Sequence, residues 1–444
     1  MDDTDVLLQA ARTAARYLEG FGGRRVGVRA RYDQLYERLA RPLPEAGEAA
    51  SRVIDELARD VGDGLLHSAG PRFFGWVIGG TLPVAVAADW LTAAWDQNAA
   101  LYQCSPAGAV VEEIAGTWLK ELLGLPAACS FALVTGCQMA HFTALAAARE
   151  RLLARRGVDV ARVGLSGAPP LRVLTGAHRH ESLLQAVRFL GLGTDAVEAL
   201  PLDGDGRLLP AALSEALERD DRPTIVCLMA GDLNTGAADP FVAACELAHE
   251  RGAWVHVDGA FGLWLNASDR HRDALAGVER ADSWATDGHK WLNLPYDVGF
   301  VFVRDVEAHA AAMSTTASYF IAPDGAGRDP MRWNPEWSRR ARGFVVYAAL
   351  RALGRRGVAE LVDRCCALAA RLVTELAALP GVELISPARM NQGLVRFRDV
   401  DGDHDARTDA VIEAIQREGT AWFGGASWRG MRVMRVSVCS HRTR

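Results

Sequence analysis

Apolar residues near the start of the chain recur with the spacing of amphipathic helices. In residues 5–12 and 49–57 they return every few positions, which places them on one face of a helix. Pro42 and Pro44 lie between these stretches and interrupt the pattern, because proline has no backbone N–H to continue a helix. Residues 1–75 are therefore predicted to form an N-terminal helical arm.

Short apolar runs alternate with helical stretches through the middle of the chain. The runs cover residues 172–175, 224–229, 254–257 and 299–303. Such alternation is typical of an α/β core built on a mostly parallel sheet, so residues 76–325 are predicted to form a large α/β domain.

The last part of the chain predicts a smaller domain of mixed structure. Helical patterns at residues 341–353 and 358–379 precede apolar runs at 382–385 and 394–397. Residues 326–444 are therefore expected to form a small C-terminal α+β domain. The sequence contains no internal repeat and no low-complexity linker.

Composition narrows the class of protein. The 444 residues, 50% hydrophobic and 23% charged, can bury a large core. No apolar run approaches the roughly 20 residues that cross a bilayer, and the first five residues are acidic where a signal peptide would be basic. We therefore expect a cytoplasmic protein without a membrane partner. A net charge of −6 provides no basic surface for nucleic acid. The eight cysteines lack Cys-x-x-Cys spacing, which argues against a disulfide framework or a zinc ribbon.

The candidate chemistry centres on Asp258 and Lys290, which lie 32 positions apart (290 − 258). Asp258 follows a strand-like run, and Lys290 stands between His289 and Trp291 in a chain with few lysines beside its many arginines. Pyridoxal phosphate needs such a pair, because an aspartate keeps its ring nitrogen protonated and a lysine stores its aldehyde as an imine. The lysine becomes nucleophilic when a desolvated, electropositive setting lowers its pKa. The alternative is a solvated loop lysine.

The residues around this pair resemble the conserved blocks of the group II pyridoxal-phosphate decarboxylases, which act on aromatic amino acids, histidine or glutamate. The block at 282–299 resembles the family's cofactor-lysine block, and 256–260 its aspartate block. Further similar blocks follow in family order from about Pro71 to the end of the chain: 71–74, 105–107, 135–136, 234–236, 338–340 and 434–437. The resemblance implies decarboxylation of an L-amino acid through a Lys290 imine and a quinonoid intermediate. It also implies the fold of type I pyridoxal-phosphate enzymes, similar to aspartate aminotransferase, with a mostly parallel seven-stranded sheet.

The turn before the alanine-rich stretch 139–149 is a candidate phosphate site. Gly136, Cys137 and Gln138 lie where backbone N–H groups at a helix N-terminus favour an anion. The family's phosphate loop is similar, although Cys137 and Gln138 replace its usual glycine or serine. A nucleophilic role for Cys137 is the weaker alternative, because no third group completes a catalytic set. His141 is expected to serve packing or an interface.

The resemblance assigns further cofactor contacts. His180, followed by Glu181 and Ser182, matches the histidine that stacks on the pyridine ring; a metal pair with His178 is the alternative, but alternate residues rarely converge without further ligands. No metal is expected. Asn234 matches a loop near the cofactor's phenolic oxygen, with a simple turn as its alternative. Three more residues are expected to contact the cofactor: Ala260, Asp287 and His289.

The resemblance also addresses the product and the substrate. Tyr319, 29 positions after Lys290 (319 − 290), matches the tyrosine that protonates the former α-carbon to give an amine. Aldehyde-forming relatives carry phenylalanine at the position of this tyrosine, and Phe320 is adjacent to Tyr319. A shift of one residue in the alignment with the family would therefore predict an aldehyde instead of an amine. An ordinary packed tyrosine is the other alternative. The expected catalytic residues are Lys290, Tyr319, His180 and Asp258.

The substrate pocket is expected to include Trp76, Val77, Ile78 and Asn98. This apolar wall with one amide favours a neutral or aromatic side chain, because no arginine is present to pair a second carboxylate. Three alternative functions stay open: oxidative decarboxylation and deamination to an aldehyde, an aminotransferase, and a protein that binds pyridoxal phosphate without activity.

The family's assembly implies a homodimer with shared active sites, in which the helical arm finds support. Relatives usually continue beyond the strand-like residues 434–438 into a threonine-led helix, whereas this sequence ends at Arg444. The resemblance therefore predicts that a final helix is missing.

Overall fold

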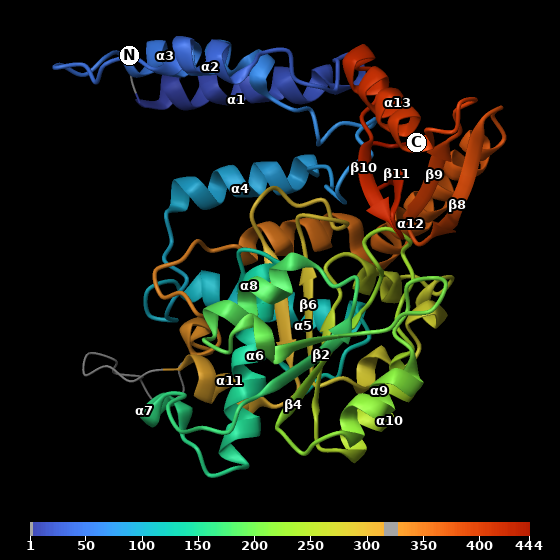
Figure 1. Ribbon diagram of the computed structural model, residues 1–444. Helices are drawn as coiled ribbons and strands as arrows, with labels where there is room; N and C mark the ends of the chain where they lie inside the picture. Colours follow the sequence, from blue (N-terminus) through green and yellow to red (C-terminus); the bar gives the residue numbers. More distant parts are fainter. Residues whose placement is uncertain (1–2, 315–326) are drawn as a thin grey trace.

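The computed structural model describes residues 3–314 and 327–444 as an α/β molecule with a smaller β-sheet domain (Figure 1). Its α-helices are α1 (Asp3–Glu19), α2 (Tyr32–Leu39), α3 (Ala50–Val61), α4 (Pro83–Trp95), α5 (Pro106–Leu122), α6 (Cys137–Ala154), α7 (Val160–Val163), α8 (Glu181–Phe189), α9 (Pro210–Glu218), α10 (Phe241–Glu250), α11 (Val306–Met313), α12 (Gly343–Ala377) and α13 (His404–Glu418). Its strands are β1 (Ser130–Val134), β2 (Arg172–Gly176), β3 (Val197–Leu200), β4 (Thr224–Met229), β5 (Trp254–Asp258), β6 (Ser283–Asp287), β7 (Gly299–Val303), β8 (Val382–Arg389), β9 (Gln392–Phe397), β10 (Gly424–Trp428) and β11 (Met431–Ser437).

The large domain is built on a seven-stranded sheet with the order β1-β7-β6-β5-β4-β2-β3. The pairings from β6 to β3 are parallel, whereas β7 lies antiparallel to both of its neighbours, β1 and β6. The chain reverses between β6 and β7 because the residues that join them form a loop without a helix, and parallel neighbours need a longer crossover. The prediction of a mostly parallel seven-stranded sheet is confirmed.

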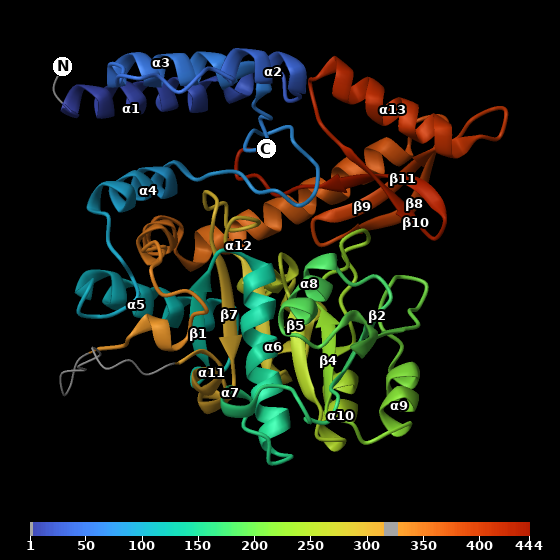
Figure 2. The ribbon, with the colours of Figure 1, turned by 60° about the vertical axis from the view of Figure 1, so that its left-hand side comes forward.

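Helices cover both faces of this sheet (Figure 2). On one face lies α6, whose residues Ala140, Ala144 and Ala147 are fully buried. Their small side chains let the helix lie close to the strands, which explains why this helix is rich in alanine. The opposite face carries a second core, to which α5, α10 and α12 contribute.

The small domain contains a four-stranded antiparallel sheet with the order β10-β11-β9-β8, against which α12 and α13 pack. The sequence predicted two helices where α12 lies. The structure agrees, because α12 consists of two helical segments that meet at a kink at Gly354, whose φ of 60° and ψ of 178° are not helical. Glycine tolerates this backbone because it has no Cβ. The domain boundaries at residues 75 and 325 stay predictions.

The arm formed by α1, α2 and α3 lies at the end of the molecule away from the large sheet (Figures 1 and 2). It is attached to the small domain. Arg25 donates to the carbonyl oxygens of Gln416 at 3.2 Å and Glu418 at 3.0 Å. The arm leaves Leu7, with 68% of its surface exposed, and other apolar side chains open to solvent. Among the described residues, no helix is both long and apolar enough to cross a membrane.

Candidate active site

The carboxyl ends of β5 and β6 meet at one edge of the large sheet, where most of the predicted site residues gather. Asp258 is the last residue of β5, Asp287 is the last residue of β6, and α6 begins just after β1 at the same edge. Gly299 starts β7 there, and a Cβ at this position would overlap the backbone of Gly136. Ligands of open α/β sheets bind at this kind of edge.

Lys290 lies in the turn after β6, and its ammonium faces a carboxylate. Its Nζ is 3.1 Å from Oδ2 of the buried Asp287. Burial lowers the pKa of Lys290, but the charge and hydrogen bond of Asp287 together with Cys137 and Asp258 outweigh this effect, so the pKa lies above its ordinary value. The expectation of a lowered pKa is therefore wrong for this structure, because the setting of the amine is anionic rather than electropositive.

Asp287 also connects this turn to the start of α6. Its Oδ1 accepts the backbone N–H of Cys137 at 2.7 Å and lies 3.5 Å from Nε2 of His289. Nδ1 of His289 accepts the N–H of Val298 at 3.2 Å, so the ring proton sits on Nε2, toward Asp287. Burial lowers the pKa of His289 and favours this neutral form. A Cβ at Gly136 would lie 3.1 Å from the same ring.

Asp258 is held as an anion inside the large domain. Its Oδ1 accepts the N–H of Ala260 at 3.1 Å, and its Oδ2 lies 3.5 Å from Nε2 of His141. Burial raises the pKa of Asp258, but His141 and the charge of Lys290 outweigh it, so the pKa lies below its ordinary range. The carbonyl of Ala260 accepts the N–H of Asp287 at 3.0 Å, which ties the two acidic strand ends together.

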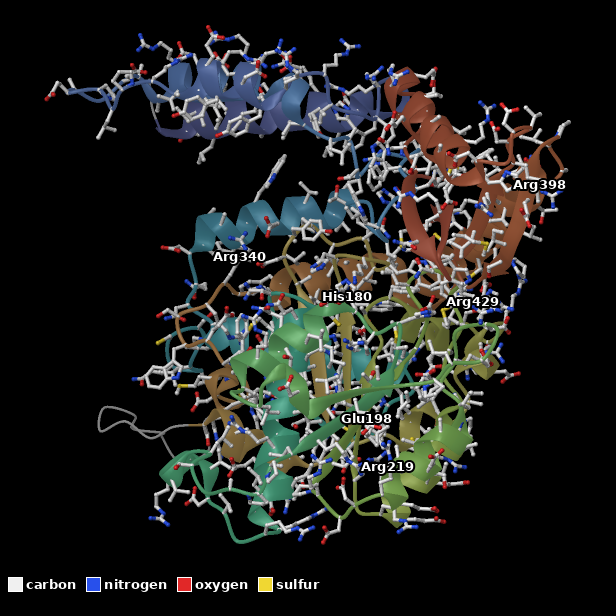
Figure 3. The ribbon with its side chains drawn as sticks, viewed as in Figure 1. His180, Glu198, Arg219, Arg340, Arg398 and Arg429 are labelled. Carbon is white, nitrogen blue, oxygen red and sulfur yellow. The ribbon has the colours of Figure 1, made fainter. Side chains whose placement is uncertain are left out.

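His180 caps the N-terminus of α8, at the end of the large domain that faces α4 (Figure 3). Its Nδ1 accepts the backbone N–H of Ser182 at 3.2 Å and lies 2.7 Å from the hydroxyl of the same serine. A ring nitrogen that accepts carries no proton, so the proton of the neutral ring sits on Nε2. Partial burial lowers the pKa of His180, although Asp258 raises it, and Lys290 and His141 lower it further.

Cys137, His141 and Asp258 place possible metal-ligand atoms within 4.8 Å of one another. Burial raises the pKa of the Cys137 thiol well above its ordinary value, and Asp287 and Asp258 raise it further. A protonated thiol is a poor metal ligand and a poor nucleophile. The expectations that the site holds no metal and that Cys137 is not a nucleophile stay predictions.

The segment expected to form the substrate pocket runs beside the lysine turn. A Cβ at Gly79 would overlap the carbonyl oxygen of Lys290, so glycine is needed for this close approach. The next residue, Gly80, donates its N–H to Oδ1 of Asn293 at 2.7 Å. These contacts hold residues 76–78 close to the turn that carries Lys290.

The four expected pocket residues differ in what they offer. Trp76 is 53% exposed and its ring lies 4.4 Å from that of Trp422, while Ile78 is partly buried. Val77 is 1% exposed and packs in the main core, so its side chain does not reach the surface of the site. The amide oxygen of Asn98 accepts backbone N–H groups of Ala100 at 3.1 Å and of Arg339. Asn98 thus supports its own loop.

Two other expected residues, Gln138 and Asn234, have no observed side-chain contact with Lys290 or Asp258 among the described residues. The side chain of Gln138 is exposed at the start of α6. The backbone of Asn234 donates to Oδ1 of Asp232 at 2.8 Å within a turn, as its alternative interpretation stated. Tyr319 lies outside the described residues, so its role stays a prediction.

Histidines in the core beneath Asp258 were missed as site residues. His141 was expected to pack or to form an interface, but it is fully buried, lies 2.9 Å from the ring of His256 and faces Asp258. One signal could have located this pair. His256 and Asp258 alternate on a strand and so share a face, and His141 is the only imidazole of the alanine-rich helix α6 that covers that face.

Tyr296 was also missed. It is 62% exposed, and its ring lies against His289 with 4.4 Å between the ring centroids. Burial raises the pKa of its hydroxyl, whereas the nearby charge of Lys290 lowers it. Tyr296 therefore places a solvent-accessible aromatic ring next to the lysine turn.

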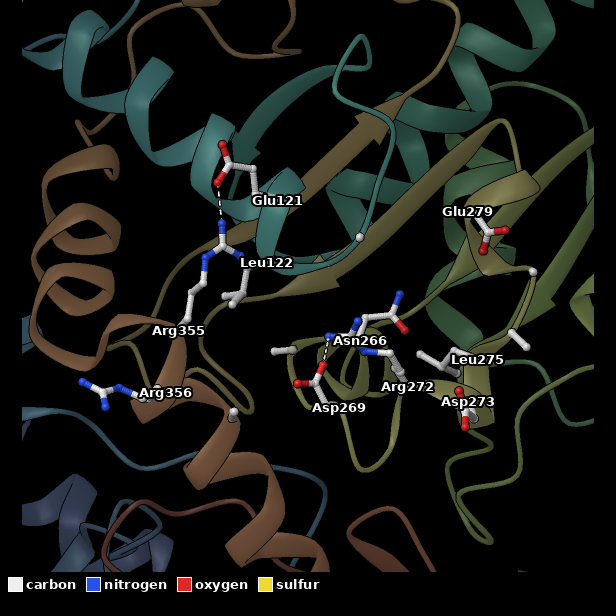
Figure 4. Close-up of a pocket in the computed structure, with 15 residues that line it drawn as sticks. Glu121, Leu122, Asn266, Asp269, Arg272, Asp273, Leu275, Glu279, Arg355 and Arg356 are labelled. Carbon is white, nitrogen blue, oxygen red and sulfur yellow. Dashed lines mark hydrogen bonds and ion pairs between the residues drawn. The ribbon is translucent and has the colours of Figure 1, made fainter.

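A surface pocket of about 530 Å³ lies elsewhere, between the end of α5, α12 and residues 266–279 (Figure 4). Two ion pairs lie among its charged residues, Arg355 with Glu121 and Arg272 with Asp269. None of the predicted site residues lines it. The chemistry described above is therefore confined to the edge of the sheet.

Comparison with known proteins identifies the family. Residues 33–400 match the model of the pyridoxal-dependent decarboxylase conserved domain. The chain is 26% identical to the aromatic-L-amino-acid decarboxylase of Bacillus atrophaeus over 425 residues, which cover 93% of this chain and 86% of that protein. It is 32% identical to the L-2,4-diaminobutyrate decarboxylase of Rhizobium meliloti, over 72% of this chain and 64% of that protein. The crystal structure of Oryza sativa TDC with PLP and tryptamine has the same fold, with a TM-score of 0.93 at 24% identity, covering 99% of this chain and 94% of that one.

The chain therefore belongs to the group II pyridoxal-phosphate-dependent amino acid decarboxylases, and pyridoxal phosphate is its cofactor. The residues at the edge of the sheet fit that cofactor. The N-terminus of α6 suits a phosphate, the anionic Asp258 suits a protonated ring nitrogen, and Lys290 offers an amine.

Proposed function

We propose that the chain converts an L-amino acid with a neutral or aromatic side chain to the corresponding amine and CO2 at the site around Lys290. The observation that carries this proposal is the placement of the Lys290 amine and the anionic Asp258 at one edge of the sheet, where each affects the pKa of the other. When bound, pyridoxal phosphate supplies an electron sink for the bond that breaks at the α-carbon.

In this proposal each group has a defined task. Lys290 holds the cofactor through its amine, and Asp258 pairs with the ring nitrogen. The first turn of α6, at Gly136, Cys137 and Gln138, would hold the phosphate, because helix N-termini have N–H groups without partners inside the helix; the N–H of Cys137 is engaged by Asp287 in this structure. Asp287 accepts the N–H of Cys137 and pairs with Lys290, so it orients both.

The other expected cofactor contacts surround the ring. His180 would hold the ring face, and its Nε2–H would be available to the substrate carboxylate, since its Nδ1 is engaged by Ser182. His289 steadies Asp287 and the glycine of the phosphate loop. Ala260 and Asn234 stay predicted contacts: Ala260 donates its N–H to Asp258, and the backbone of Asn234 donates to Asp232.

Aromatic side chains near the lysine turn support a neutral or aromatic substrate. Trp76 lies against Trp422, and Phe73 stacks on the same ring with 4.9 Å between centroids. The exposed ring of Tyr296 adds a further apolar surface. Ile78 completes this wall, whereas a dicarboxylate would need a cation to pair its second carboxylate. The relatives named above act on aromatic amino acids and on diaminobutyrate, so the substrate assay must include both kinds.

A panel of L-amino acids tests the proposed function. Purified protein loaded with pyridoxal phosphate should release CO2 and an equal amount of amine from neutral or aromatic members of the panel. Release of CO2 from glutamate or diaminobutyrate alone would overturn the proposed substrate class, although the protein would still be a decarboxylase. Transfer of the amino group to a keto acid without CO2 would favour an aminotransferase. Binding of pyridoxal phosphate without formation of any product would show a cofactor-binding protein that has no catalytic activity.

The product depends on the proposed proton donor. Replacing Tyr319 by phenylalanine should lower amine formation by about 100-fold or more, because a positioned acid in the transition state contributes that much. Substrate KM should change little. If the former α-carbon of the substrate is not protonated, it can react with oxygen instead. The yields of aldehyde, ammonia and peroxide should therefore rise in air as oxygen is consumed.

A matched variant checks this assignment. Phe320→Tyr leaves Tyr319 in place and should keep the amine as the main product. If the unmodified protein already forms mostly aldehyde, oxidative decarboxylation replaces the simple reaction. If Tyr319→Phe changes nothing, Tyr319 is not the donor.

A homodimer with shared active sites is proposed for the assembly. Apolar side chains of the arm and of α4 are exposed in the single chain, including Leu7, Leu57, Trp90, Leu91 and Trp95. Burying each would contribute roughly 1.5–3 kcal/mol, which favours covering them with a second copy. A cytoplasmic location stays a prediction.

Mixing two inactive proteins tests the shared site. The Lys290→Ala and Tyr319→Phe proteins are mixed in equal amounts so that their subunits exchange. If Tyr319 reaches its partner's site, amine formation should recover at about a quarter of the sites. Half of the random dimers are mixed, and each mixed dimer has one intact site out of two. A mixture of Lys290→Ala with Asp258→Asn provides the matched control, because both residues belong to the same chain's site. The shared site would be contradicted if the mixture of Lys290→Ala with Tyr319→Phe recovered no amine formation. A protein that sediments as a monomer and is fully active would also contradict it.

A further inference from the structure

A chain of buried polar groups runs from Asp258 into the core beneath it, with hydrogen bonds between all of its members except the first pair. Nε2 of His141 lies 3.5 Å from Oδ2 of Asp258, and Nδ1 of His141 lies 2.9 Å from Nε2 of His256. Nδ1 of His256 is 2.9 Å from the hydroxyl of Ser283, which accepts the indole N–H of Trp254 at 2.9 Å. Both histidines and the serine are fully buried.

The fold places these groups together through the alternation of the strands. His256 and Asp258 share one face of β5, and Ser283 is the register neighbour of His256 on β6. Because α6 covers this face, His141 reaches both residues of β5. The hydrogen-bond chain is therefore built from two strands and one helix of the rigid core.

The chemistry of the groups at its two ends sets the direction in which the hydrogen bonds of this series donate. The indole of Trp254 can only donate, so the oxygen of Ser283 accepts from it. Among the described residues, His256 is the acceptor within hydrogen-bond distance of the Ser283 hydroxyl, so that proton goes to Nδ1 of His256. The neutral ring of His256 then donates from Nε2 to Nδ1 of His141, and His141 donates from Nε2 toward the carboxylate.

The same direction follows from the carboxylate end. An ionised Asp258 can only accept, and Nε2 of His141 makes no hydrogen bond among the described residues, so its N–H faces Oδ2 of Asp258 across 3.5 Å. Burial and the neighbouring His141 lower the pKa of His256 to about 3, although Asp258 raises it, so His256 is neutral at physiological pH. Aligned donors stabilise the anion cooperatively and leave its charge available to a cationic partner.

We propose that His141 is a positioning residue that, through its hydrogen bond to His256 and the hydrogen bond of His256 to Ser283, keeps Asp258 ionised and aimed at the ring nitrogen of the cofactor. This inference rests on the proposed role of Asp258. Other titratable groups also act on that carboxylate and are unchanged in the variants below: Cys137 of α6, Cys227 of β4, His180 before α8 and Lys290 after β6.

Two substitutions separate a hydrogen-bonding role from simple packing. His141→Leu fills similar space without polar atoms, whereas His141→Gln keeps one acceptor and one donor and can restore the chain. His309→Leu is the matched control, since His309 is also fully buried, with its ring nitrogens 2.8 Å from the hydroxyl of Ser130 and 2.9 Å from the carbonyl of Trp333.

The readout is the NMR chemical shift of the ring nitrogen in isotope-labelled pyridoxal phosphate bound to each protein, followed from neutral to alkaline pH. Wild type, His141→Gln and His309→Leu should keep this nitrogen protonated throughout. In His141→Leu it should lose its proton at lower pH, and the cofactor Kd should rise roughly 10- to 100-fold, as for a lost hydrogen bond to a charged group.

Each outcome decides the inference. A folded His141→Leu protein with the titration and cofactor Kd of wild type would overturn it. If His141→Leu does not fold, Ser283→Ala decides, because it removes the hydroxyl that orients His256; it should shift the titration in the same direction, and no shift would overturn the inference. A wild-type protein whose bound cofactor has an unprotonated ring nitrogen would instead refute the proposed role of Asp258.

Discussion

Lys290→Arg is expected to abolish amine formation while the protein stays folded. Arginine keeps a positive charge beside Asp287 but cannot form the bond that holds the cofactor, because its guanidinium does not lose its proton in proteins. Amine formation should fall by at least roughly a thousandfold, as when a covalent catalyst is removed from an enzyme. The measurement is amine release per active site, with circular dichroism to verify the fold.

The sequence offers a matched control for this experiment. Lys120 and Lys290 are the two lysines of the chain. The ammonium of Lys120 donates to the carbonyl oxygens of Ala127 at 2.6 Å and Cys129 at 3.0 Å, so it supports a turn. Lys120→Arg should therefore retain near-normal turnover. Substantial activity in Lys290→Arg would remove this residue from the mechanism.

Asp258→Asn is expected to have the next largest effect. The amide has the same shape but no charge, so the proton on the cofactor's ring nitrogen loses its counter-ion. We expect turnover to fall about 100- to 1,000-fold, the range for removing one preorganised electrostatic contact, and the cofactor to bind more weakly. Steady-state kinetics and equilibrium dialysis with pyridoxal phosphate measure the two effects separately.

Asp239→Asn is the control for the loss of a buried carboxylate. Asp239 also lies near the end of β4, where it accepts the N–H groups of Leu208 and Met229, both at 2.7 Å. Burial raises its pKa to about 6, and it has no assigned role at the cofactor. Its variant should lose stability but keep its turnover number. Near-normal turnover in Asp258→Asn would refute the pairing with the ring nitrogen.

Local sequence predicted the parts of the fold that depend on periodicity. The four apolar runs of the core became β2, β4, β5 and β7, because a buried strand needs apolar residues on both faces. Strand β6 is less apolar, since Ser283 and Asp287 on it serve the site. The antiparallel direction of β7 depends on the loop before it rather than on its own residues.

The candidate site was predictable where one residue carries one role. Lys290 and Asp258 follow strand ends, and Gly136 precedes a helix, so their approximate positions followed from the order of elements. Contacts between elements could not be derived this way. The pKa of Lys290 depends on Asp287, and the role of His141 depends on how α6 lies over β5, which only tertiary packing fixes.

Peptide mapping after borohydride reduction tests the central claim most directly. Reduction of the protein loaded with pyridoxal phosphate should fix the pyridoxyl group permanently on the peptide that contains Lys290, with one group per chain. The peptide that contains Lys120 should stay unmodified, which makes the two lysines of this sequence an internal comparison. A pyridoxyl group on Lys120, or no modification of either lysine, would contradict the assignment of Lys290 as the residue that holds the cofactor.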